Sequence, residues 1–271
     1  MDITVNGLRL NYELDGQGPA VLLLHPVGLD LTWWEPQAEA LRSEFQVVRM
    51  DFRGHGKSAI APPPYTLADF AADAHALLGT LGIGSAHIIG LSLGGMVAQV
   101  LALEYPRDVR SLVLSNTLCT LPAEARQAMR ARGEAAEQGG MAAVAQATIE
   151  RWFTRGFLDS TLVARCRRHL LAHDVGAWAA TWRAIAELDT LPRLGEIHVP
   201  TLVTTGDADV STPIAAAQLI ASGIPGAVLK IMAGAPHMAP YERPELFNPL
   251  ALEFLRSNEL PRGKPGGIRT P

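Results

Sequence analysis

Two patterns of hydrophobic residues follow one another along the chain. Near the amino end, two short stretches alternate apolar and polar residues around Asn6-Gly7, a dipeptide that favours the positive φ angles of a tight hairpin turn. After residue 19, continuous apolar runs appear, typical of strands buried under helices on both faces. We therefore predict an antiparallel hairpin followed by parallel strands at Ala20–His25, Gln46–Asp51, His87–Leu91, Val109–Ser115, Thr201–Thr205 and Val228–Met232.

Helical periodicity fills the segments between these strands. The clearest case is Thr66–Leu81, which begins with a threonine cap, carries Asp69 in its first turn and ends at Gly82. A second helical run, Met96–Tyr105, directly follows a glycine-rich turn. Alternating strands and helices of this kind predict an α/β fold with helices on both faces of a twisted sheet.

A long helical insertion interrupts the alternation. Between Ser115 and Thr201 the pattern is helical only, rich in Ala and Arg, and it returns to the sheet at Pro200. We expect a core formed by residues 1–118 and 191–258, and a helical cap formed by residues 119–190 over the carboxyl ends of the strands. Residues 259–271 are rich in Pro and Gly with little to bury, so a disordered tail is expected.

Composition narrows the class of protein. The chain has 271 residues, of which 48% are hydrophobic and 18% charged, a balance that excludes a disordered chain. The net charge of −4, without blocks of like charge, argues against nucleic acid as a partner and favours a small molecule. Composition gives no information on the oligomeric state.

Cysteines and targeting signals add little chemistry. Cys119 and Cys166 are far apart and predict buried, reduced thiols rather than a disulfide or a metal site. The amino end lacks the basic and apolar regions of a signal peptide, and no apolar run is long enough to span a membrane. We therefore expect a cytoplasmic enzyme.

The sharpest motif is Gly90-Leu-Ser92-Leu-Gly94-Gly95, which lies between a predicted strand and a predicted helix. The G-x-S-x-G pattern forms a strained strand-to-helix turn that lifts the serine hydroxyl above the sheet. A Gly-rich helix start capped by Ser92 is the alternative, but strand, turn and helix all coincide here. We therefore predict that Ser92 is a nucleophile.

A serine nucleophile needs a histidine base, which in this topology follows the serine along the chain. Four histidines satisfy that order: His169, His173, His198 and His237. The first two lie in the helical insertion and the third at a strand entry, where structural roles are expected. His237 follows the strand Val228–Met232 directly, so we predict it as the base.

The base in turn needs a carboxylate that orients it. Asp207 and Asp209 both follow the strand Thr201–Thr205. Asp207 adjoins a glycine and suits a turn, whereas Asp209 lies further out, before the helix that Pro213 begins. We favour Asp209; Asp174 and Asp189 belong to the cap, where helix-end roles are expected.

Acyl transfer also needs two donors for the oxyanion. The turn supplies the N–H of Leu93, the residue after the serine. The second donor is expected from the loop after the first parallel strand, His25-Pro26-Val27-Gly28, where Pro26 has no N–H and Val27 does. His25 precedes the serine in sequence, so we expect it to tie this loop together rather than act as a base.

The loop Asp51–Ser58 is rich in glycine but lacks the spacing of a phosphate-binding motif. We interpret it as a tight loop whose Asp51, Arg53 and Ser58 bond to backbone near the site. No dinucleotide motif or metal-ligand cluster appears in the sequence, so we predict neither a cofactor nor a metal.

Five segments together resemble the α/β-hydrolase superfamily over residues 2–257. They begin at His25 (HPVG), Asp51 (DFRGHGKS), Gly90 (GLSLGG), Gly206 (GDADVSTP) and His237 (HMAPYERP). The segments 27–37 (VGLDLTWWEPQ), 151–154 (RWFT) and 177–186 (AWAATWRAIA) are most similar to the 3-oxoadipate enol-lactonase group. The resemblance implies an α/β-hydrolase fold, aligns Asp209 with the family's triad acid, and implies that Trp152 lines the pocket under the cap.

The resemblance implies hydrolysis of an ester or lactone through an acyl-enzyme, with no cofactor. A serine at the turn argues against dehalogenases and epoxide hydrolases, which have an aspartate there. Three alternatives remain: a general carboxylesterase, a carbon–carbon bond hydrolase with the same triad, and a non-catalytic ligand receptor. Among the cap arginines, one could pair with a substrate carboxylate; the candidates are Arg130, Arg132, Arg151, Arg155 and Arg183.

Overall fold

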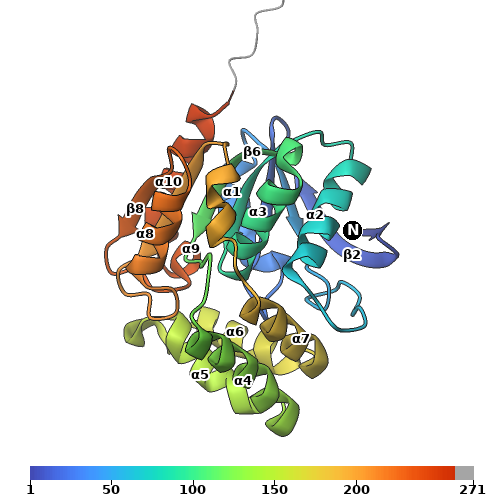
Figure 1. Cartoon of the computed structure of the whole chain (residues 1–271), viewed down its shortest axis with the longest axis vertical. Helices are drawn as coiled ribbons and strands as arrows, with labels where there is room; N and C mark the ends of the chain where they lie inside the picture. The colour runs from blue at the N-terminus through green and yellow to red at the C-terminus, as the bar shows by residue number, and fades with distance from the viewer. Residues whose placement is uncertain (260–271) are drawn as a thin grey trace, which may run out of the picture.

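One sheet of eight strands organises residues 1–259, the part of the chain that the computed structural model describes (Figure 1). The strand order is β1-β2-β4-β3-β5-β6-β7-β8. β1 and β2 form an antiparallel hairpin, β2 also pairs antiparallel with β4, and every later neighbour is parallel. The strands are β1 (Asp2–Val5), β2 (Leu8–Asp15), β3 (Ala20–Leu24), β4 (Gln46–Met50), β5 (Ala86–Leu91), β6 (Val109–Ser115), β7 (Thr201–Gly206) and β8 (Val228–Met232). The predicted fold class is confirmed.

The strand boundaries lie close to the predicted ones. β6 and β8 match the prediction, and Asn6 and Gly7 take the positive φ values of 50° and 73° expected at the hairpin turn. β7 extends one residue further, because Gly206 still pairs with Met232. β3 ends one residue early, since His25 leaves the ladder to bond across loops.

Helices flank the sheet. α2 starts at the predicted place, where Thr66 and Asp69 form a capping box. α3 begins at Leu93, three residues before the predicted start, because the helix continues directly from the turn at Ser92. The core helices are α1 (Glu35–Leu41), α2 (Leu67–Thr80), α3 (Leu93–Glu104), α8 (Ile214–Gly223), α9 (Ala239–Glu242) and α10 (Pro244–Ser257), with 3-10 turns η1 (Leu31–Trp34), η2 (Pro106–Asp108) and η4 (Leu191–Glu196).

Four helices between β6 and β7 lie together beyond one end of the sheet (Figure 1). They are α4 (Ala123–Gly139), α5 (Ala142–Trp152), α6 (Thr161–Ala172) and α7 (Val175–Ala186), with η3 (Arg155–Phe157) between α5 and α6. The two ends of this segment meet, because Thr120 pairs with Asp189 and the Thr190 N–H donates to the Cys119 carbonyl over 2.8 Å.

The order of strands creates a switch point beside β3. The chain runs from β3 to β4 on one side and then returns to β5 on the other, with Leu24 paired to Gly90. Loops leave such neighbouring strands in opposite directions, which opens a crevice at their carboxyl ends. The loop from His25 and the turn at Ser92 therefore adjoin this crevice.

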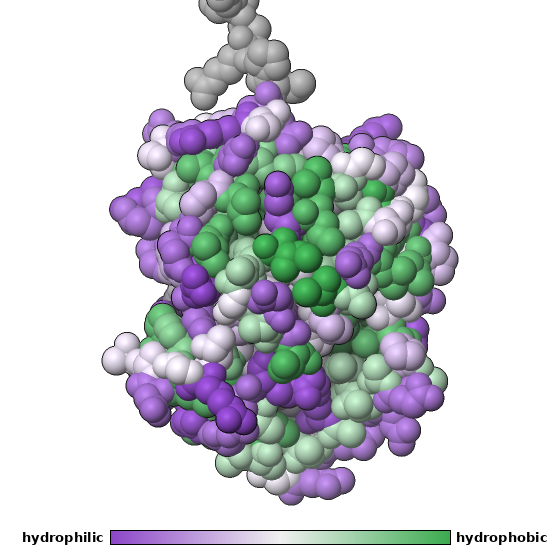
Figure 2. Space-filling view, turned by 90° about the vertical axis from the view of Figure 1, so that its left-hand side faces the viewer, coloured by the Kyte–Doolittle hydropathy of each residue, from purple (hydrophilic) through white to green (hydrophobic). Residues whose placement is uncertain are grey.

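The other edge of the sheet is β8. Val228 and Ile231 are about half exposed there, at 47% and 48%, and a hydrophobic area covers part of this side of the molecule (Figure 2). Exposed Lys230 lies between them in sequence. A lysine on an edge strand discourages pairing with another chain.

Both cysteines are buried and free, as expected, and burial raises the pKa of Cys119 to about 11 and that of Cys166 to about 12. Glu259, placed with the tail by the sequence, is instead paired with Arg110 at 3.1 Å. The rest of the expected disordered tail, residues 260–271, lies outside the described residues. Within the described residues, no helix is long and apolar enough to cross a bilayer.

Candidate active site

Ser92 occupies a backbone conformation that the neighbouring glycines make possible. It joins β5 to α3 with φ 55° and ψ −112°, a region that residues with a side chain rarely adopt. A Cβ on Gly90 would lie 2.6 Å from the Gly95 nitrogen, and one on Gly94 would lie 2.6 Å from the Leu24 carbonyl carbon. Glycine is therefore needed on both sides of the serine for the chain to turn this sharply.

Bonds to the end of β6 hold the strained turn. The Ser92 N–H donates to the Ser115 carbonyl over 3.0 Å, and Thr117 Oγ1 donates to the Ser92 carbonyl over 2.7 Å. Ser92 itself is 7% exposed and therefore largely buried.

His237 and Asp209 come together from the ends of adjacent strands. Asp209 follows β7 and His237 follows β8, and His237 Nδ1 lies 2.9 Å from Asp209 Oδ2. Only 2% of His237 and 6% of Asp209 is exposed. Because Nδ1 faces the carboxylate, Nε2 is the ring nitrogen left for other partners.

Hydrogen bonds satisfy both oxygens of the Asp209 carboxylate. Oδ1 accepts from the N–H groups of Ser211 and Thr212, at 2.7 and 2.9 Å. Oδ2 accepts from Asn116 Nδ2 at 2.8 Å and from the Thr212 hydroxyl, besides His237. Burial alone would raise the pKa of Asp209, but the charge of His237 and these hydrogen bonds lower it to about 2. The carboxylate is ionised at neutral pH.

Asn116 was not singled out from the sequence. It follows β6, takes φ 46°, and its Nδ2 bonds both Asp209 and the Pro236 carbonyl, which precedes His237. It thus links the carboxylate to the histidine loop. The sequence did offer one signal for Asn116, because it is a polar residue directly after a buried strand. Thr212, which also bonds Asp209, was not identified from the sequence either.

Two backbone amides adjoin the switch point beside Ser92. Leu93 is the first residue of α3, so its N–H has no acceptor within the helix. Among the described residues, neither the Leu93 N–H nor the Val27 N–H has a hydrogen-bond acceptor. Gly28, at φ 73°, turns the chain immediately after Val27. These free donors suit a developing negative charge.

His25 ties loops together, as predicted. Its Nδ1 donates to the Pro26 carbonyl over 2.8 Å, and its Nε2 accepts from the Phe52 N–H over 3.0 Å. Burial lowers the pKa of His25, in spite of the opposing influence of Asp51. The loop that carries Val27 is therefore fixed to the loop that begins at Asp51.

In the Asp51–Ser58 loop, all three expected side chains bond to backbone groups. Asp51 accepts from the Leu31 and Lys57 N–H groups, at 2.7 and 2.8 Å, and Ser58 Oγ donates to the Asp51 carbonyl. Arg53 Nη2 donates to the Asp69 carbonyl over 3.3 Å, and the guanidinium also binds the buried Asp73 carboxylate over 2.8 and 2.9 Å. The ion pair with Asp73 is the stronger contact, and the sequence did not suggest it.

The other candidate carboxylates have structural roles. Asp207 Oδ1 accepts from the Gly234 N–H and fixes the loop that leads to His237. Asp174 caps α7 by accepting from the Ala177 N–H over 2.8 Å, and Asp189 accepts from Thr120 Oγ1. None of the three bonds to His237.

Trp152 reaches both the helical segment and the histidine. Its ring centroid lies 6.3 Å from that of His237, and its carbonyl accepts from the Met238 N–H over 3.0 Å. It also lines a cavity of about 350 Å³ between α4, α5 and α7.

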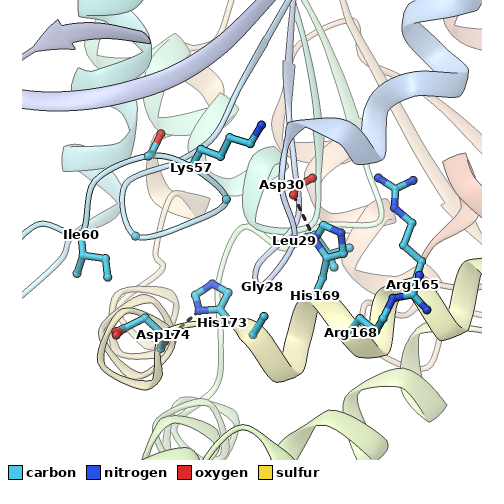
Figure 3. Close-up of a pocket in the computed structure, with 14 residues that line it drawn as sticks. Gly28, Leu29, Asp30, Lys57, Ile60, Arg165, Arg168, His169, His173 and Asp174 are labelled. Carbon is cyan, nitrogen blue, oxygen red and sulfur yellow. Dashed lines mark hydrogen bonds and ion pairs between the residues drawn. The ribbon is translucent and has the colours of Figure 1, made fainter. Parts of the chain in front are cut away.

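A larger cavity of about 630 Å³ lies elsewhere, between α6 and the loops at Gly28–Asp30 and Gly54–Ile60 (Figure 3). Across it, His169 Nδ1 pairs with Asp30 Oδ2 at 3.2 Å. Ser92, Asp209 and His237 do not line it. The volume of a cavity therefore does not by itself identify the candidate site.

Within residues 1–259, no group of three or more His, Cys, Asp or Glu side chains is arranged to hold a metal ion.

Comparison with known proteins places this geometry in context. Residues 19–244 match the sequence profile of the family described as alpha/beta hydrolase fold. The chain is 32% identical over 250 residues to 3-oxoadipate enol-lactonase 2 of Acinetobacter baylyi, covering 91% of this chain and 92% of that protein.

Solved structures give the same picture. A hydrolase from Pseudomonas aeruginosa is 36% identical with a TM-score of 0.90, covering 94% of this chain and 97% of the other. The enol-lactonase from Burkholderia xenovorans is 32% identical with a TM-score of 0.90, covering 94% of this chain and all of the other.

Proposed function

This chain belongs to the alpha/beta hydrolase family, and we propose that within it the protein is a serine hydrolase that cleaves a carboxylic ester or lactone through an acyl-enzyme. Ser92 is the nucleophile, His237 the general base and Asp209 the carboxylate that orients it. Val27 and Leu93 supply the N–H groups of the oxyanion hole. Residues 119–190 form the cap that selects the substrate.

One observation carries this proposal. A buried, ionised Asp209 is hydrogen-bonded at 2.9 Å to His237 Nδ1, at the same edge of the sheet as the strained turn at Ser92. A carboxylate on Nδ1 fixes the tautomer in which Nε2 can accept a proton. It also stabilises the imidazolium that forms when the serine proton is transferred.

In the first half of the reaction, Ser92 Oγ attacks the carbonyl carbon while His237 Nε2 takes the hydroxyl proton. The carbonyl oxygen becomes an oxyanion held by the Val27 and Leu93 N–H groups, and each such donor typically contributes about 10²- to 10³-fold to the rate. The carbon–oxygen bond to the leaving group then breaks, and the imidazolium proton passes to the leaving oxygen.

In the second half, water loses a proton to His237 and attacks the acyl-enzyme. The tetrahedral intermediate collapses, the proton returns to Ser92 Oγ, and the carboxylic acid leaves. In a lactone, the leaving oxygen stays on the same molecule as the acyl group throughout, so deacylation releases a single product molecule. No cofactor takes part in this sequence.

For the substrate, similarity to 3-oxoadipate enol-lactonases supports a lactone of that kind before a general ester. A panel of 3-oxoadipate enol-lactone, neutral lactones, aryl esters and a vinylogous diketone separates the lactonase, the esterase and the carbon–carbon hydrolase. We expect the enol-lactone to give the highest kcat/KM. A preference of orders of magnitude for neutral esters would leave a general carboxylesterase.

The catalytic assignment is tested with an activated aryl ester. Ser92→Ala should lower kcat by about 10⁴- to 10⁶-fold, since loss of a triad nucleophile typically has that effect. Ser111→Ala controls for handling and folding, because Ser111 is a buried serine on β6 whose hydroxyl bonds His87, with no other side-chain partner within residues 1–259. Equal rates for Ser92→Ala and the wild type would remove the hydrolase proposal and favour a non-catalytic receptor.

A further inference from the structure

The C-terminal end of α5 is bonded to both loops that carry the proposed acid and base. The last carbonyl groups of a helix find no N–H within it and need donors from elsewhere. Ser211 Oγ donates to the Arg151 carbonyl over 3.3 Å, and the Met238 N–H donates to the Trp152 carbonyl over 3.0 Å. Ser211 lies two residues after the proposed acid, and Met238 directly follows the proposed base. The end of this helix therefore contacts the two catalytic loops at once.

A carboxylate on α9 extends the contact. Beyond Trp152 the chain is extended, and the Thr154 N–H donates to Glu242 Oε2 over 3.0 Å, while the Thr154 hydroxyl donates to Glu242 Oε1. Both oxygens of one carboxylate thus bind one residue, in a partly buried place where α9 faces α5 (Figure 1). Hydrogen bonds to a carboxylate are about twice as strong as those between neutral groups.

α9 is a single turn of four residues that needs support from outside. Nucleating a helical turn fixes several residues for one hydrogen bond, so an isolated turn is unfavourable. Its N-cap residue is a methionine, whose side chain makes no capping bond. Neighbouring elements hold it instead: Gln37 Nε2 of α1 donates to the Pro240 carbonyl over 2.7 Å, and Thr154 donates to Glu242. The direction in which this turn leaves the preceding loop depends on these contacts.

His237 lies between a part of the chain that the core holds and a part that α5 holds. Before it, the Pro236 carbonyl accepts from Asn116 Nδ2 over 3.3 Å. After it, the next residue and Glu242 are both bonded to α5. The ring itself is oriented by one side-chain acceptor, Asp209 Oδ2, 2.9 Å from Nδ1. Without the bonds to α5, the backbone after the histidine can move, and the ring moves with it.

We propose that Glu242 and Thr154 are positioning residues, whose paired hydrogen bonds hold the loop after His237 against α5 and thereby keep the imidazole aligned with Asp209. The inference rests on the proposed function, because His237 acts as a base only in that mechanism. α5 belongs to the proposed cap, so a shift of α5 when substrate binds reaches the base through these bonds. The cap then influences kcat as well as KM.

The main test compares Glu242→Ala, which removes both acceptors, with Glu242→Gln, whose amide can still accept from the Thr154 N–H and donate to its hydroxyl. Activity is expressed per active site, counted by exhaustive fluorophosphonate labelling, so that a smaller folded fraction does not lower kcat. For an activated aryl ester, Glu242→Ala should lower kcat by about 10- to 100-fold, because a misplacement of about 1 Å can cost about 100-fold. KM should stay within about threefold, and Glu242→Gln should keep kcat within about threefold of the wild type.

Glu245→Ala is the matched control for Glu242→Ala. Glu245 is an exposed carboxylate in the first turn of α10 that pairs with Arg243 at 2.6 Å. Its loss should leave kcat and KM within about twofold of the wild type, because exposed ion pairs contribute little.

A second pair of variants changes the donor and holds even if Glu242→Ala does not fold. Thr154→Val keeps the shape and the N–H but removes the hydroxyl donor, and it should lower kcat per active site by about 3- to 10-fold. Thr154→Ser keeps the hydroxyl and should stay within twofold. In the proton NMR spectrum, the resonance of His237 Nδ1–H, which bonds Asp209, should shift or broaden in Thr154→Val and match the wild type in Thr154→Ser.

The outcomes separate the positioning role from the proposed function. If hydrolysis depends on Ser92 but Glu242→Ala and Glu242→Gln have equal kcat, or Thr154→Val and Thr154→Ser do, the positioning role is refuted and the hydrolase stands. If hydrolysis does not depend on Ser92, the proposed function fails. A loss of kcat in the Ala and Val variants that Gln and Ser restore supports the positioning role.

Discussion

Gly94→Ala tests whether the strained turn at Ser92 depends on close backbone approach. Gly94 is the second residue of α3, and a Cβ built there falls 2.6 Å from the Leu24 carbonyl carbon and 2.9 Å from Leu24 Cβ. Leu24 is the last residue of β3 and is fully buried between β4 and β5. Relief therefore requires the helix or the central strand to shift by about 1 Å, because a carbon atom normally needs about 3.5 Å.

Overpacking of this kind costs about 1–3 kcal/mol where side chains can move, and more where backbone must move. We expect Gly94→Ala to lower the free energy of unfolding by about 3–5 kcal/mol. The control is Gly79→Ala in α2, where nothing lies within 4 Å of the new Cβ and alanine is the better helix former. It should raise the free energy of unfolding by about 0.5–1 kcal/mol.

Urea unfolding followed by circular dichroism measures both changes. The Gly94 variant should also lose activity, because the helix start that carries the Leu93 N–H moves with respect to the Val27 loop. A Gly94→Ala protein within about 1 kcal/mol of the wild type would refute the argument that backbone contact dictates glycine at this position.

Three further changes probe the site and its surroundings. Asp209→Asn keeps the shape of the side chain but removes the charge that holds the histidine tautomer, so kcat for an aryl ester should fall by about 10⁴-fold in steady-state assays. Asn116→Gly retains the positive φ but removes the hydrogen bond to Asp209, and urea unfolding should show a loss of about 1.5–3 kcal/mol. Burial would raise the pKa of Asp30, but His169 and Thr32 lower it to about 2 from 3.8. Ionised Asp30 therefore adds to the free energy of unfolding above pH 4, and this contribution is lost as the pH falls towards 2. Asp30→Asn should therefore cost about 2 kcal/mol at pH 6 and about 1 kcal/mol at pH 3, and a cost independent of pH would contradict this reading.

Much of the fold could be predicted because its signals are local. Continuous apolar runs such as Val109–Ser115 predict strands buried on both faces, and the capping residues Thr66 and Asp69 mark the start of α2. The candidate site followed from one further rule, that polar residues directly after parallel strands gather at one sheet edge. That rule identified Ser92, Asp209 and His237, which lie in three separate segments of the sequence, as candidates for one site.

The contacts that tune the site could not be predicted in this way. Asn116 and Asp209 are 93 residues apart in sequence, and only the register of β6 against β7 brings them within 2.8 Å. The same holds for Arg53, whose partner Asp73 lies on a different element. Arg130 pairs with Glu187 and Arg183 pairs with Glu137 because α4 packs against α7, and that packing is not encoded in local periodicity.

The most direct test of the central claim, that Ser92, His237 and Asp209 act as one unit, is covalent labelling with a fluorophosphonate followed by mass spectrometry of the peptides. The account predicts one adduct per chain, on Ser92, formed at least about 10³-fold more slowly in His237→Gln and Asp209→Asn, because a free serine hydroxyl is a weak nucleophile. An adduct on another residue, or labelling of Ser92 at the wild-type rate in both variants, would contradict it.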